Sequence, residues 1–582
     1  MTFPRGSSRA PEPVVQLLPQ LLDYAATRYG SSPFLLRHAA GRWQARSFEE
    51  CARAMHAFTA LLEREGVRPG DHVGIQSENR PEWGLVYLAI LEAGAVAVPL
   101  DAQLREQEVG EILATAGATR CVVSAQQRPV LEAVKKERLP QLALLGLDAA
   151  PDLPNWESAQ REFPNEPPRP PRAEARDLAV ILFTSGTTGQ AKGVMLSHLN
   201  LLSNVEAVAR VLEFGPGDRL LSVLPLHHTF ESTGGFLCPL RVGASVAYAR
   251  GLNSRELRED MSTSGATLFI GVPLLYEKLL SAIHRGIGER PLVQRTLAHA
   301  LLVVSRTLRL IAGIRAGRTL LRPLREKAGL GTLRMFVCGA APLTPEVFWG
   351  FVDLGLPVLE GYGLTETSPV ACANRPQRPL PGGVGWPLPG VDVRIVDPDA
   401  EGNGEVAIRG PNVMIGYYGN PAATAEVLRD GWFYTGDLGR MLPDGRLRLT
   451  GRIKNMIATA AGKKIYPEEI ELYLANCPFV LEVVVMGGRD ARGEREEVHA
   501  HVYPNLPALE AHARALGKTC DGAFVESVMR QEVDARCAVL APYKRVKRVI
   551  VRRDEFAKTT TGKIRRQDLG QEPEAKRTGA VA

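Results

Sequence analysis

The sequence predicts an α/β protein in which short strands alternate with helices. Its 582 residues, 45 % of them apolar, suffice for several structural units and are too apolar for a mostly disordered chain. Such alternation is typical of layered sheets with much parallel pairing. Strands are expected at Val73–Gln76, Val96–Leu100, Arg120–Ser124, Ala179–Thr184, Leu220–Leu224, Ala244–Tyr248, Thr267–Gly271 and Arg334–Cys338. Helices are expected at Trp83–Ala93, Leu199–Leu212, Leu274–Ile283 and Pro345–Val352.

Changes in composition along the chain predict its domain organisation. Five prolines between residues 164 and 172 predict a stiff linker after an N-terminal lobe. Alternating runs separated by Gly, Pro and Asp turns predict a β-subdomain over residues 391–453. Its expected strands are Val391–Ile395, Gly404–Arg409 and Arg446–Thr450. A further α/β segment is expected at residues 454–570 and a disordered tail at residues 571–582.

Charge and composition argue against several classes of protein. A net charge of +6 gives no argument for nucleic-acid binding in a chain of this length. The first residues hold no apolar run typical of a secretory signal, and no run of 18 apolar residues predicts a membrane-spanning helix. The eight cysteines form no CxxC pair and are expected as free thiols in a reducing compartment. These observations predict a cytoplasmic protein.

The strongest local signal is a glycine- and hydroxyl-rich loop after the strand that ends at Thr184. Glycines let backbone N–H groups approach phosphate oxygens, hydroxyls donate further hydrogen bonds, and a lysine supplies a cation. A Walker A loop would need glycine and then serine or threonine where Ala191 and Gly193 stand. The loop therefore predicts a phosphate site of another kind, with a flexible hairpin as the alternative. Its residues are Thr184, Ser185, Gly186, Thr187, Thr188 and Gly189, followed by Lys192.

Four further motifs follow this loop. They are Glu360–Glu366 (EGYGLTE), Trp432–Asp437 (WFYTGD), Gly451–Lys454 (GRIK) and Thr559–Arg565 (TTTGKIR). In this order the five motifs resemble those of the adenylate-forming (AMP-binding) superfamily of acyl-CoA synthetases, peptide-synthetase adenylation domains and luciferases. The resemblance implies a large N-terminal domain, residues 1–453, of stacked αβ subdomains with the β-subdomain. It also implies a small mobile C-terminal α+β domain, residues 454–570, and ATP-dependent activation of a carboxylic acid.

The resemblance assigns the nucleotide site to particular residues. It implies that Glu366 holds Mg²⁺, that Thr365 bonds the α-phosphate, and that Asp437 and Arg452 bind the ribose. A carboxylate at a tight turn suits Mg²⁺, and one that accepts two hydrogen bonds suits vicinal hydroxyls. The alternatives are an exposed loop acid at Glu366 and a simple turn former at Asp437. Adenine is expected beside Gly361, Tyr362, Gly363 and the loop Gly339, Ala340, Ala341 and Pro342. That loop is equally compatible with an ordinary strand-to-helix turn.

The C-terminal motif supplies the expected catalytic lysine, Lys563. Its ammonium would bridge the substrate carboxylate and the α-phosphate and offset their repulsion. The alternative is one more cation in a basic tail. The resemblance also implies that Lys454 is a hinge about which the C-terminal domain turns, so that the loop of Gly462 serves thioester formation with coenzyme A. Ala191 and Ala557 stand where the family usually has proline, which is expected to loosen two loops without removing chemistry.

The segment PLHHTFE, residues 225–231, indicates which class of acid is the substrate. It resembles the long-chain fatty acyl-CoA synthetases in particular, and the resemblance places His228 beside the acyl site. A metal held by His228 and Glu231 lacks an evident third ligand. Gly234 and Gly235 predict an open pocket wall. An amino acid substrate would instead need an acidic anchor, a role open to Glu231.

The predicted reaction is therefore a fatty acid–CoA ligation. ATP and a fatty acid would give acyl-adenylate and pyrophosphate, and coenzyme A would then take the acyl group and release AMP. The alternatives are an acyl-AMP ligase that loads an acyl carrier protein, an aryl or short-chain acid–CoA ligase, and a non-catalytic scaffold. No carrier-protein motif follows in the chain, which argues against a peptide-synthetase module.

Residues 285–327 form a basic segment with ten Lys or Arg and two Glu, a net charge of +8. Apolar residues recur there at helical spacing, and arginines lie off that stripe. Such a helix either packs on its own domain with solvated arginines or lies on an anionic membrane surface at the cytoplasmic face. The stripe consists of Leu297, Leu301, Val304, Leu308 and Ile311.

Overall fold

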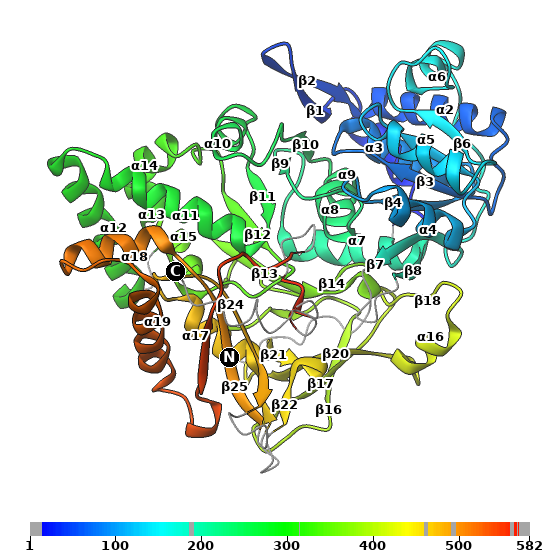
Figure 1. Cartoon of the computed structure of the whole chain (residues 1–582). Helices are drawn as coiled ribbons and strands as arrows, with labels where there is room; N and C mark the ends of the chain where they lie inside the picture. The colour runs from blue at the N-terminus through cyan, green and yellow to red at the C-terminus, as the bar shows by residue number, and fades with distance from the viewer. Residues whose placement is uncertain are drawn as a thin grey trace. The chain divides into compact units, whose positions relative to one another are not determined.

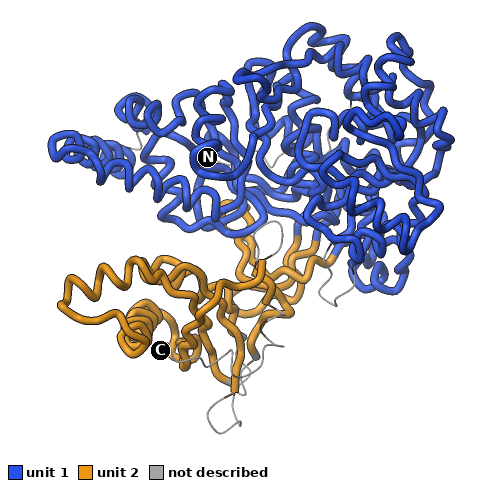
Figure 2. Tube along the Cα trace, turned by 45° about the horizontal axis from the view of Figure 1, so that its top comes forward, with its two compact units in different colours: residues 1–393, 408–433 blue, residues 394–407, 434–582 orange. Residues whose placement is uncertain are grey.

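The computed structural model describes residues 14–184, 191–312, 315–458, 464–489, 496–558, 564–566 and 569. The chain divides into two compact units, which Figure 2 draws in different colours. Unit 1 contains the chain up to Val393 together with Ile408–Phe433, and unit 2 contains Arg394–Ala407 together with the chain from Tyr434 onward. The predicted α/β class is confirmed, because mixed sheets and helices alternate through most of the described chain (Figure 1).

The first sheet of unit 1 has seven strands, and its core is parallel. β4 lies between β3 and β7, and all five of its residues are buried, as expected for a strand covered on both faces. Four of the predicted strands appear here within two residues of their expected bounds. Across the sheet the order is β18 (Gly416–Tyr417), β8 (Lys192–Ser197), β7 (Leu178–Thr184), β4 (Val96–Leu100), β3 (His72–Gln76), β5 (Arg120–Val123) and β6 (Ala143–Gly146).

The proline-rich segment 164–172 connects two parts of this same sheet. Strand β7 follows the prolines, yet it pairs in parallel with β4, which precedes them, at Ala97 and Val180. The segment is itself held in place, because the Arg169 backbone N–H donates to Glu92 Oε1 at 3.1 Å and its side chain pairs with Glu63. The strands before and after the prolines therefore belong to one layer rather than to two separate lobes.

The second sheet of unit 1 has nine strands. Its centre is parallel, and both edges turn antiparallel, at β2 on one side and at β14 and β15 on the other. The remaining predicted strands of this region appear in its middle. The order is β15 (Trp386–Pro387), β14 (Val370–Ala373), β13 (Val358–Gly363), β12 (Met335–Cys338), β11 (Leu268–Gly271), β9 (Arg219–Ser222), β10 (Ser245–Tyr248), β1 (Pro33–Ala39) and β2 (Arg42–Ser47).

The helices of unit 1 differ in how they are buried. All twelve residues of α3 are buried, which fits its apolar sequence PEWGLVYLAILE and an interior position. The N-terminus of α2 is stabilised by a capping box. The Ser47 hydroxyl accepts from the Glu50 N–H, and the Glu50 carboxylate accepts from the Ser47 N–H. The first ten helices are α1 (Gln20–Tyr29), α2 (Phe48–Arg64), α3 (Pro81–Glu92), α4 (Glu106–Ala116), α5 (Arg128–Glu137), α6 (Trp156–Glu162), α7 (His198–Leu212), α8 (Thr229–Glu231), α9 (Cys238–Val242) and α10 (Ser254–Thr263). The others are α11 (Pro273–Gly288), α12 (Leu292–Ala312), α13 (Gly317–Leu320), α14 (Arg322–Lys327), α15 (Pro345–Asp353) and α16 (Pro421–Val427).

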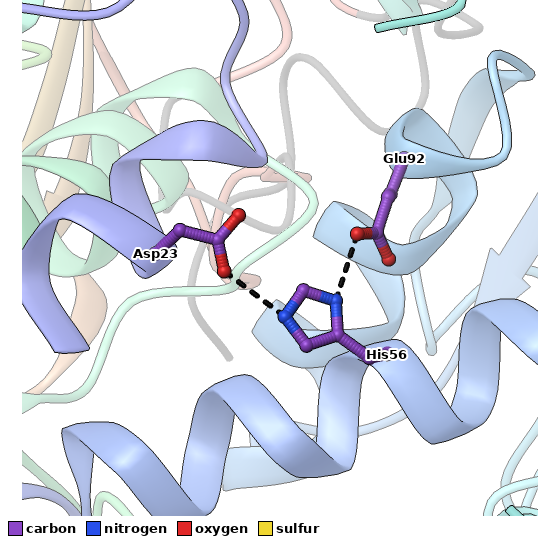
Figure 3. Close-up of side chains that lie close together, drawn as sticks. All are labelled: Asp23, His56 and Glu92. Atoms are coloured by element: carbon purple, nitrogen blue, oxygen red, sulfur yellow. Dashed lines mark hydrogen bonds and ion pairs between the residues drawn. The ribbon is translucent and has the colours of Figure 1, made fainter. Parts of the chain in front are cut away.

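A buried charged cluster ties three N-terminal helices together (Figure 3). His56 on α2 lies between Asp23 on α1 and Glu92 on α3, with Nε2 3.0 Å from Asp23 Oδ1 and Nδ1 2.7 Å from Glu92 Oε1. Burial alone would lower the pKa of His56, but its hydrogen bonds to the two carboxylates outweigh this and raise it to about 9. A metal ion here would have to displace one of these hydrogen bonds. The cluster is therefore an imidazolium held between two carboxylates.

Unit 2 contains the C-terminal sheets and helices. The chain passes between the units within β16, β17 and β20, and the predicted boundary at Lys454 stays a prediction. Apolar side chains of α17, α19, β24 and β25, such as Ile470 and Met529, form its own core. The strands are β16 (Asp392–Val396), β17 (Gly404–Arg409), β20 (Trp432–Met441), β21 (Leu447–Arg452), β22 (Ile457–Ala458), β23 (Lys464–Ile465), β24 (Val480–Arg489), β25 (Glu496–Pro504) and β26 (Arg548–Val551), whereas β19 (Leu428–Arg429) belongs to unit 1. The helices are α17 (Pro467–Ala475), α18 (Leu506–Ala515) and α19 (Gly522–Cys537).

Two further findings bear on the general character of the protein. All eight cysteines are free, and seven of them are buried. Within the described part of the chain, every helix is too short or too polar to cross a bilayer. The predicted tail at residues 571–582 lies outside the described residues.

Candidate active site

The glycine- and hydroxyl-rich loop is framed by an antiparallel pair of strands. Thr184, at the end of β7, faces Lys192, at the start of β8, and the Thr184 hydroxyl donates to the Lys192 carbonyl at 3.4 Å. The predicted phosphate residues Ser185, Gly186, Thr187, Thr188 and Gly189 lie outside the described residues. The frame nevertheless sets where the loop begins and ends, with the Lys192 side chain at its exit.

Tyr417 lies between two of the predicted nucleotide-site residues. Its hydroxyl donates a 2.8 Å hydrogen bond to Glu366 Oε1, and the Lys192 ammonium lies 5.0 Å from the centre of its ring. Tyr417 holds this place because β18 pairs with β8, so that Tyr417 faces Val194. One aromatic side chain thus brings a cation and a carboxylate from distant motifs to the same site.

The turn that carries Thr365 and Glu366 is tightly constrained. It leaves β13 and forms a single 3₁₀ turn, Thr365–Thr367. Gly363 at the end of β13 has no room for a side chain, because an added Cβ would lie 1.8 Å from the Pro369 carbonyl oxygen. The buried Thr367 hydroxyl accepts from the Leu364 N–H at 2.9 Å and lies 2.7 Å from the Pro369 carbonyl. These contacts fix the direction of the Glu366 backbone.

Three asparagine side chains stabilise this turn through hydrogen bonds to backbone carbonyls. Asn204 on α7 donates to the Val370 carbonyl at 2.6 Å, and Asn412 donates to the Thr367 carbonyl at 3.0 Å. Asn200, also on α7, donates to two carbonyls of the segment that contains Asn412. Buried amides that pair with backbone in this way are costly to remove. They are therefore positioning residues for the turn, and none was predicted from sequence.

Glu366 has the chemistry of a Mg²⁺ ligand. It is partly exposed, one carboxylate oxygen accepts from Tyr417, and the other accepts no hydrogen bond from any described residue. Mg²⁺ is commonly held by one or two carboxylates together with phosphate oxygens. The residues present fit such an ion, as the sequence predicts.

The predicted adenine loop follows β12. Ala340, Ala341 and Pro342 are exposed, and Ala340 has a φ of 73°, in the left-handed region that is uncommon for alanine. Gly339 is buried against Phe230, and an added Cβ would lie 2.8 Å from that ring. The structure thereby brings this loop into contact with the segment that contains His228. Exposed backbone beside an aromatic ring leaves room for a flat base, although a plain strand-to-helix turn would look the same here.

Asn79 holds the chain that leads to His228. Its side-chain amide donates to the Leu224 carbonyl at 2.5 Å and its oxygen accepts from the Leu226 N–H at 3.0 Å. His228 precedes α8, and its ring lies 4.1 Å from that of His227, measured between centres. Burial lowers the pKa of His227 to about 4, so that this neighbour is neutral at pH 7.

Glu231 and Gly235 correct two expectations. Glu231 is fully buried and accepts a 2.5 Å hydrogen bond from the Ser222 hydroxyl, so it is no accessible anchor for an amino acid substrate. Burial raises its pKa to about 8, against hydrogen bonds from Ser222 and the Val223 backbone, and a protonated carboxyl suits this apolar surrounding. Gly235 lies in a π-helix, Ser232–Leu237, and an added Cβ would lie 2.6 Å from the Glu231 carboxyl group. This glycine therefore makes room for Glu231 and forms no open wall.

Unit 2 contains the two residues that are predicted to bind the ribose. Asp437 on β20 faces Arg452 on β21, and Arg452 Nε donates to Asp437 Oδ1 at 2.5 Å. The Asp437 N–H donates to the Thr435 hydroxyl at 3.0 Å, which in turn donates to the Val406 carbonyl. Asp437 is buried, whereas the Arg452 side chain is 39 % exposed. The pair is thus a fixed carboxylate with an accessible cation beside it.

The other predicted residues of unit 2 are only partly described. Lys454 follows β21, and burial together with Arg452 lowers its pKa below the ordinary lysine value. Gly462 and Lys563 lie outside the described residues. The segments on either side of the Lys563 loop pair with each other at Lys558 and Ile564.

Comparison with known proteins defines the class. A model of the AMP-binding enzyme family matches residues 22–418, which is more than half of the chain. The chain therefore belongs to the AMP-binding enzyme family, and the resemblance drawn from its five motifs is confirmed.

Three relatives show the breadth of that family. The chain is 30 % identical to human long-chain-fatty-acid–CoA ligase 1, over 90 % of this chain and 80 % of the relative. It is 31 % identical to a feruloyl-CoA synthase of Amycolatopsis, over 77 % and 81 % of the two chains. Among solved structures, ATP-bound MatB of Rhodopseudomonas palustris superposes with a TM-score of 0.75 at 28 % identity, over 96 % and 99 % of the chains.

Proposed function

We propose that the protein is an ATP-dependent acid–CoA ligase that acts on fatty acids. ATP and the fatty acid form an acyl-adenylate with release of pyrophosphate. Coenzyme A then attacks the acyl carbon through its thiol, and the new thioester leaves with AMP released. Both steps proceed within one chain.

The observation that carries this proposal is the placement of Lys192 and Glu366 about Tyr417. A lysine at the exit of a glycine-rich loop offsets phosphate charge, and a carboxylate beside it suits the ion that accompanies ATP. The bound Mg²⁺ would neutralise charge on the leaving pyrophosphate. Thr365, on the same 3₁₀ turn as Glu366, would donate to the α-phosphate.

The remaining roles follow the family motifs. The loop Thr184–Gly189 holds phosphates, residues 339–342 and 361–363 hold adenine, and Asp437 with Arg452 holds the ribose. Lys563 bridges the acid's carboxylate and the α-phosphate as the new bond forms, because its charge offsets the repulsion between two anions. Rotation about Lys454 then withdraws Lys563 and brings the Gly462 loop into use for thioester formation.

The choice of a fatty acid rests on three observations. Relatives that align with most of the chain include long-chain fatty acid–CoA ligases. The segment PLHHTFE resembles theirs, and it lies against the Gly339 loop through Phe230. Glu231 is buried and provides no anchor for an ammonium group. An aryl acid is the second candidate, favoured by the similarity to feruloyl-CoA synthase.

One assay separates these candidates. The purified full-length protein is given ATP, Mg²⁺ and acids of graded chain length or aryl acids, with and without coenzyme A. We expect AMP release and thioester formation to be greatest with long-chain acids and to require coenzyme A for multiple turnovers. Preference for an aryl or short-chain acid would contradict the assignment of a fatty acid as substrate. Formation of thioester on an acyl carrier protein but not on coenzyme A would contradict coenzyme A as the acceptor.

A further inference from the structure

Helix α12 presents an unusual outer face at the edge of unit 1 (green, left in Figure 1). Only Ala298 and Ser305 of this helix are buried, and Leu301, Leu302 and Leu308 are half-buried. The Ser305 hydroxyl donates to the Asp353 carbonyl on α15 at 2.8 Å. Arg309 pairs with the Asp353 carboxylate through two hydrogen bonds and stacks 4.0 Å from the centre of the Trp349 ring. These contacts fix which side of α12 faces the protein.

The side that faces away is apolar. Seven large hydrophobic side chains on α12 are between 45 % and 83 % exposed. At 100° per residue they share one side of the helix with Thr296, Ala300 and Thr307, and these ten positions include no charged residue. A surface helix normally turns its apolar stripe inward and its charges outward. The exposed hydrophobic residues are Leu292, Val293, Leu297, Val303, Val304, Leu310 and Ile311.

Cations border this apolar face. Arg295 and Arg306 lie along one flank of α12, both are exposed, and neither forms an ion pair with any described residue. Arg285 before the helix and Arg315 and Arg318 after it are exposed as well. The segment 285–327 carries a net charge of +8, which leaves −2 for the rest of the chain. The net positive charge of the protein is therefore concentrated around a helix whose outer face is apolar.

We propose that the outer face of α12 docks into the interfacial region of an anionic lipid bilayer. The apolar side chains would enter the boundary between headgroups and acyl chains, while Arg295 and Arg306 contact anionic headgroups. This arrangement places the helix in the plane of the surface and leaves its contacts with α15 unchanged. The inference is independent of the proposed function, because it uses no residue of the nucleotide or acyl site.

Charge decides between a membrane and a second copy of the chain. Two copies that met through α12 would bring two segments of +8 against each other, which opposes association. A bilayer of anionic lipid instead attracts the arginines and accepts the apolar face. Attraction of this kind weakens as salt shortens the screening length from ~10 Å at 0.1 M to ~3 Å at 1 M.

Vesicle flotation of the full-length protein tests the proposal. Vesicles of phosphatidylglycerol with phosphatidylcholine are compared with vesicles of phosphatidylcholine alone, at about 0.05 M and about 0.5 M salt. We expect binding to the anionic vesicles at low salt, several-fold weaker binding at high salt, and little binding to the neutral vesicles. Absence of binding to anionic vesicles at low salt would overturn the proposal.

Variants locate the binding face. The double variant Val303→Asp with Leu310→Asp places charge on the apolar face at exposed positions and is expected to lower the partition coefficient by about tenfold or more. Val539→Asp is the matched control, since Val539 is 75 % exposed but lies in unit 2, and it should bind as the wild type does. Arg295→Gln with Arg306→Gln should bind more weakly and with a shallower salt dependence. Wild-type partition in the Asp double variant would refute docking through α12.

Two further measurements keep the test decisive. In Leu310→Trp, the fluorescence emission of the introduced tryptophan should shift to shorter wavelength when anionic vesicles are added. This variant reports insertion without placing a charge on the apolar face. An unshifted emission would contradict insertion. Sedimentation velocity without lipid shows whether a second copy of this chain binds the outer face of α12 instead. A wild-type dimer that dissociates in the Asp double variant would replace the membrane by a second copy of this chain.

Discussion

Tyr417 donates a 2.8 Å hydrogen bond to Glu366 Oε1, and the two residues are separated by 51 positions in the chain. The same ring lies beneath the Lys192 ammonium. Glu366 would otherwise be a partly exposed acid at the end of a turn, free to rotate. The phenol orients one of its oxygens and leaves the other to a cation. Tyr417 is thus a positioning residue for Glu366, the magnesium ligand of the proposed function.

The first prediction removes this hydroxyl. Tyr417→Phe should keep the ring and the cation–π contact but release Glu366, so that KM for Mg-ATP rises roughly tenfold or more, the effect of losing a hydrogen bond to a charged group. The melting temperature should change little. Tyr418→Phe is the control, because it removes a hydroxyl from the next residue, whose ring packs on His72 instead. Equal effects of the two variants would contradict the positioning role.

The second prediction concerns Glu366 itself. Glu366→Gln keeps the size of the side chain and the hydrogen bond from Tyr417 but removes the negative charge that suits Mg²⁺. We expect a folded protein with strongly impaired adenylation that excess Mg²⁺ restores only in part. Steady-state adenylation across a Mg²⁺ titration is the measurement, and a wild-type rate in the variant would exclude Glu366 as a metal ligand.

The third prediction separates the two half-reactions at Lys563. Removal of one preorganised electrostatic donor typically lowers a rate by ~10²–10³. Lys563→Ala should lose acyl-adenylate formation by at least that factor. Given synthetic acyl-adenylate and coenzyme A, it should still form thioester at close to the wild-type rate. Equal damage to both half-reactions in a folded variant would contradict the alternation of domains.

Lys454→Pro should show the opposite pattern. Proline fixes φ near −65° and would hinder rotation at this position. Adenylation should then be retained while thioester formation from synthetic acyl-adenylate falls. Lys454→Ala serves as the control that removes the side chain without fixing the backbone, and it should be affected less in the second half-reaction.

The fourth prediction concerns pH and the His56 cluster. The pKa of His56 is raised from 6.5 in a free histidine to about 9, so its charge stabilises the fold fully below about pH 6.5 and this contribution is lost as pH rises through 9. The contribution is on the order of 3 kcal/mol. The pKa of Glu92 is lowered by its bond to His56 despite burial, so its contribution disappears in acid instead.

The gap in melting temperature between wild type and His56→Gln should therefore narrow as pH is raised from about 7 to about 10. His299→Gln, which changes an exposed histidine on α12, should leave the melting temperature close to wild type throughout. A gap that stays constant or widens above pH 7 would show that His56 is neutral in the folded protein.

Much of the fold follows from local sequence. Eight strands of the two large sheets, β3, β4, β5, β7 and β9 to β12, appear within a few residues of their predicted positions, as do the helices α3, α7, α11 and α15. Apolar runs and turn residues define each of these elements locally. The hairpin of β1 and β2 was not predicted, since it gains its stability from pairing with β10, about two hundred residues away. Long-range pairing leaves no local pattern.

The candidate site also contains residues that local sequence predicts and residues that it does not. Motifs identify Lys192, Glu366 and Asp437, because their chemistry lies in short contiguous runs. They do not identify Tyr417, which is positioned by strand pairing between distant segments, or the asparagines Asn200, Asn204 and Asn412, whose side-chain amides donate to distant backbone carbonyls. The tyrosine pair after Gly416 was the available signal, an aromatic dipeptide within a glycine-rich turn. Gly235 shows the reverse error, since a glycine that predicted open space instead accommodates a buried carboxyl group.

The central claim is that this chain activates a carboxylic acid as its adenylate. Acid-dependent exchange of labelled pyrophosphate into ATP, measured without coenzyme A, tests it most directly, since exchange requires reversible formation of a bound acyl-adenylate. We predict that the full-length protein with Mg²⁺ exchanges label only when a fatty acid is present, and that Lys563→Ala reduces the exchange by at least ~10². Exchange that is absent with every acid of the graded series, or that proceeds equally without acid, would contradict the account.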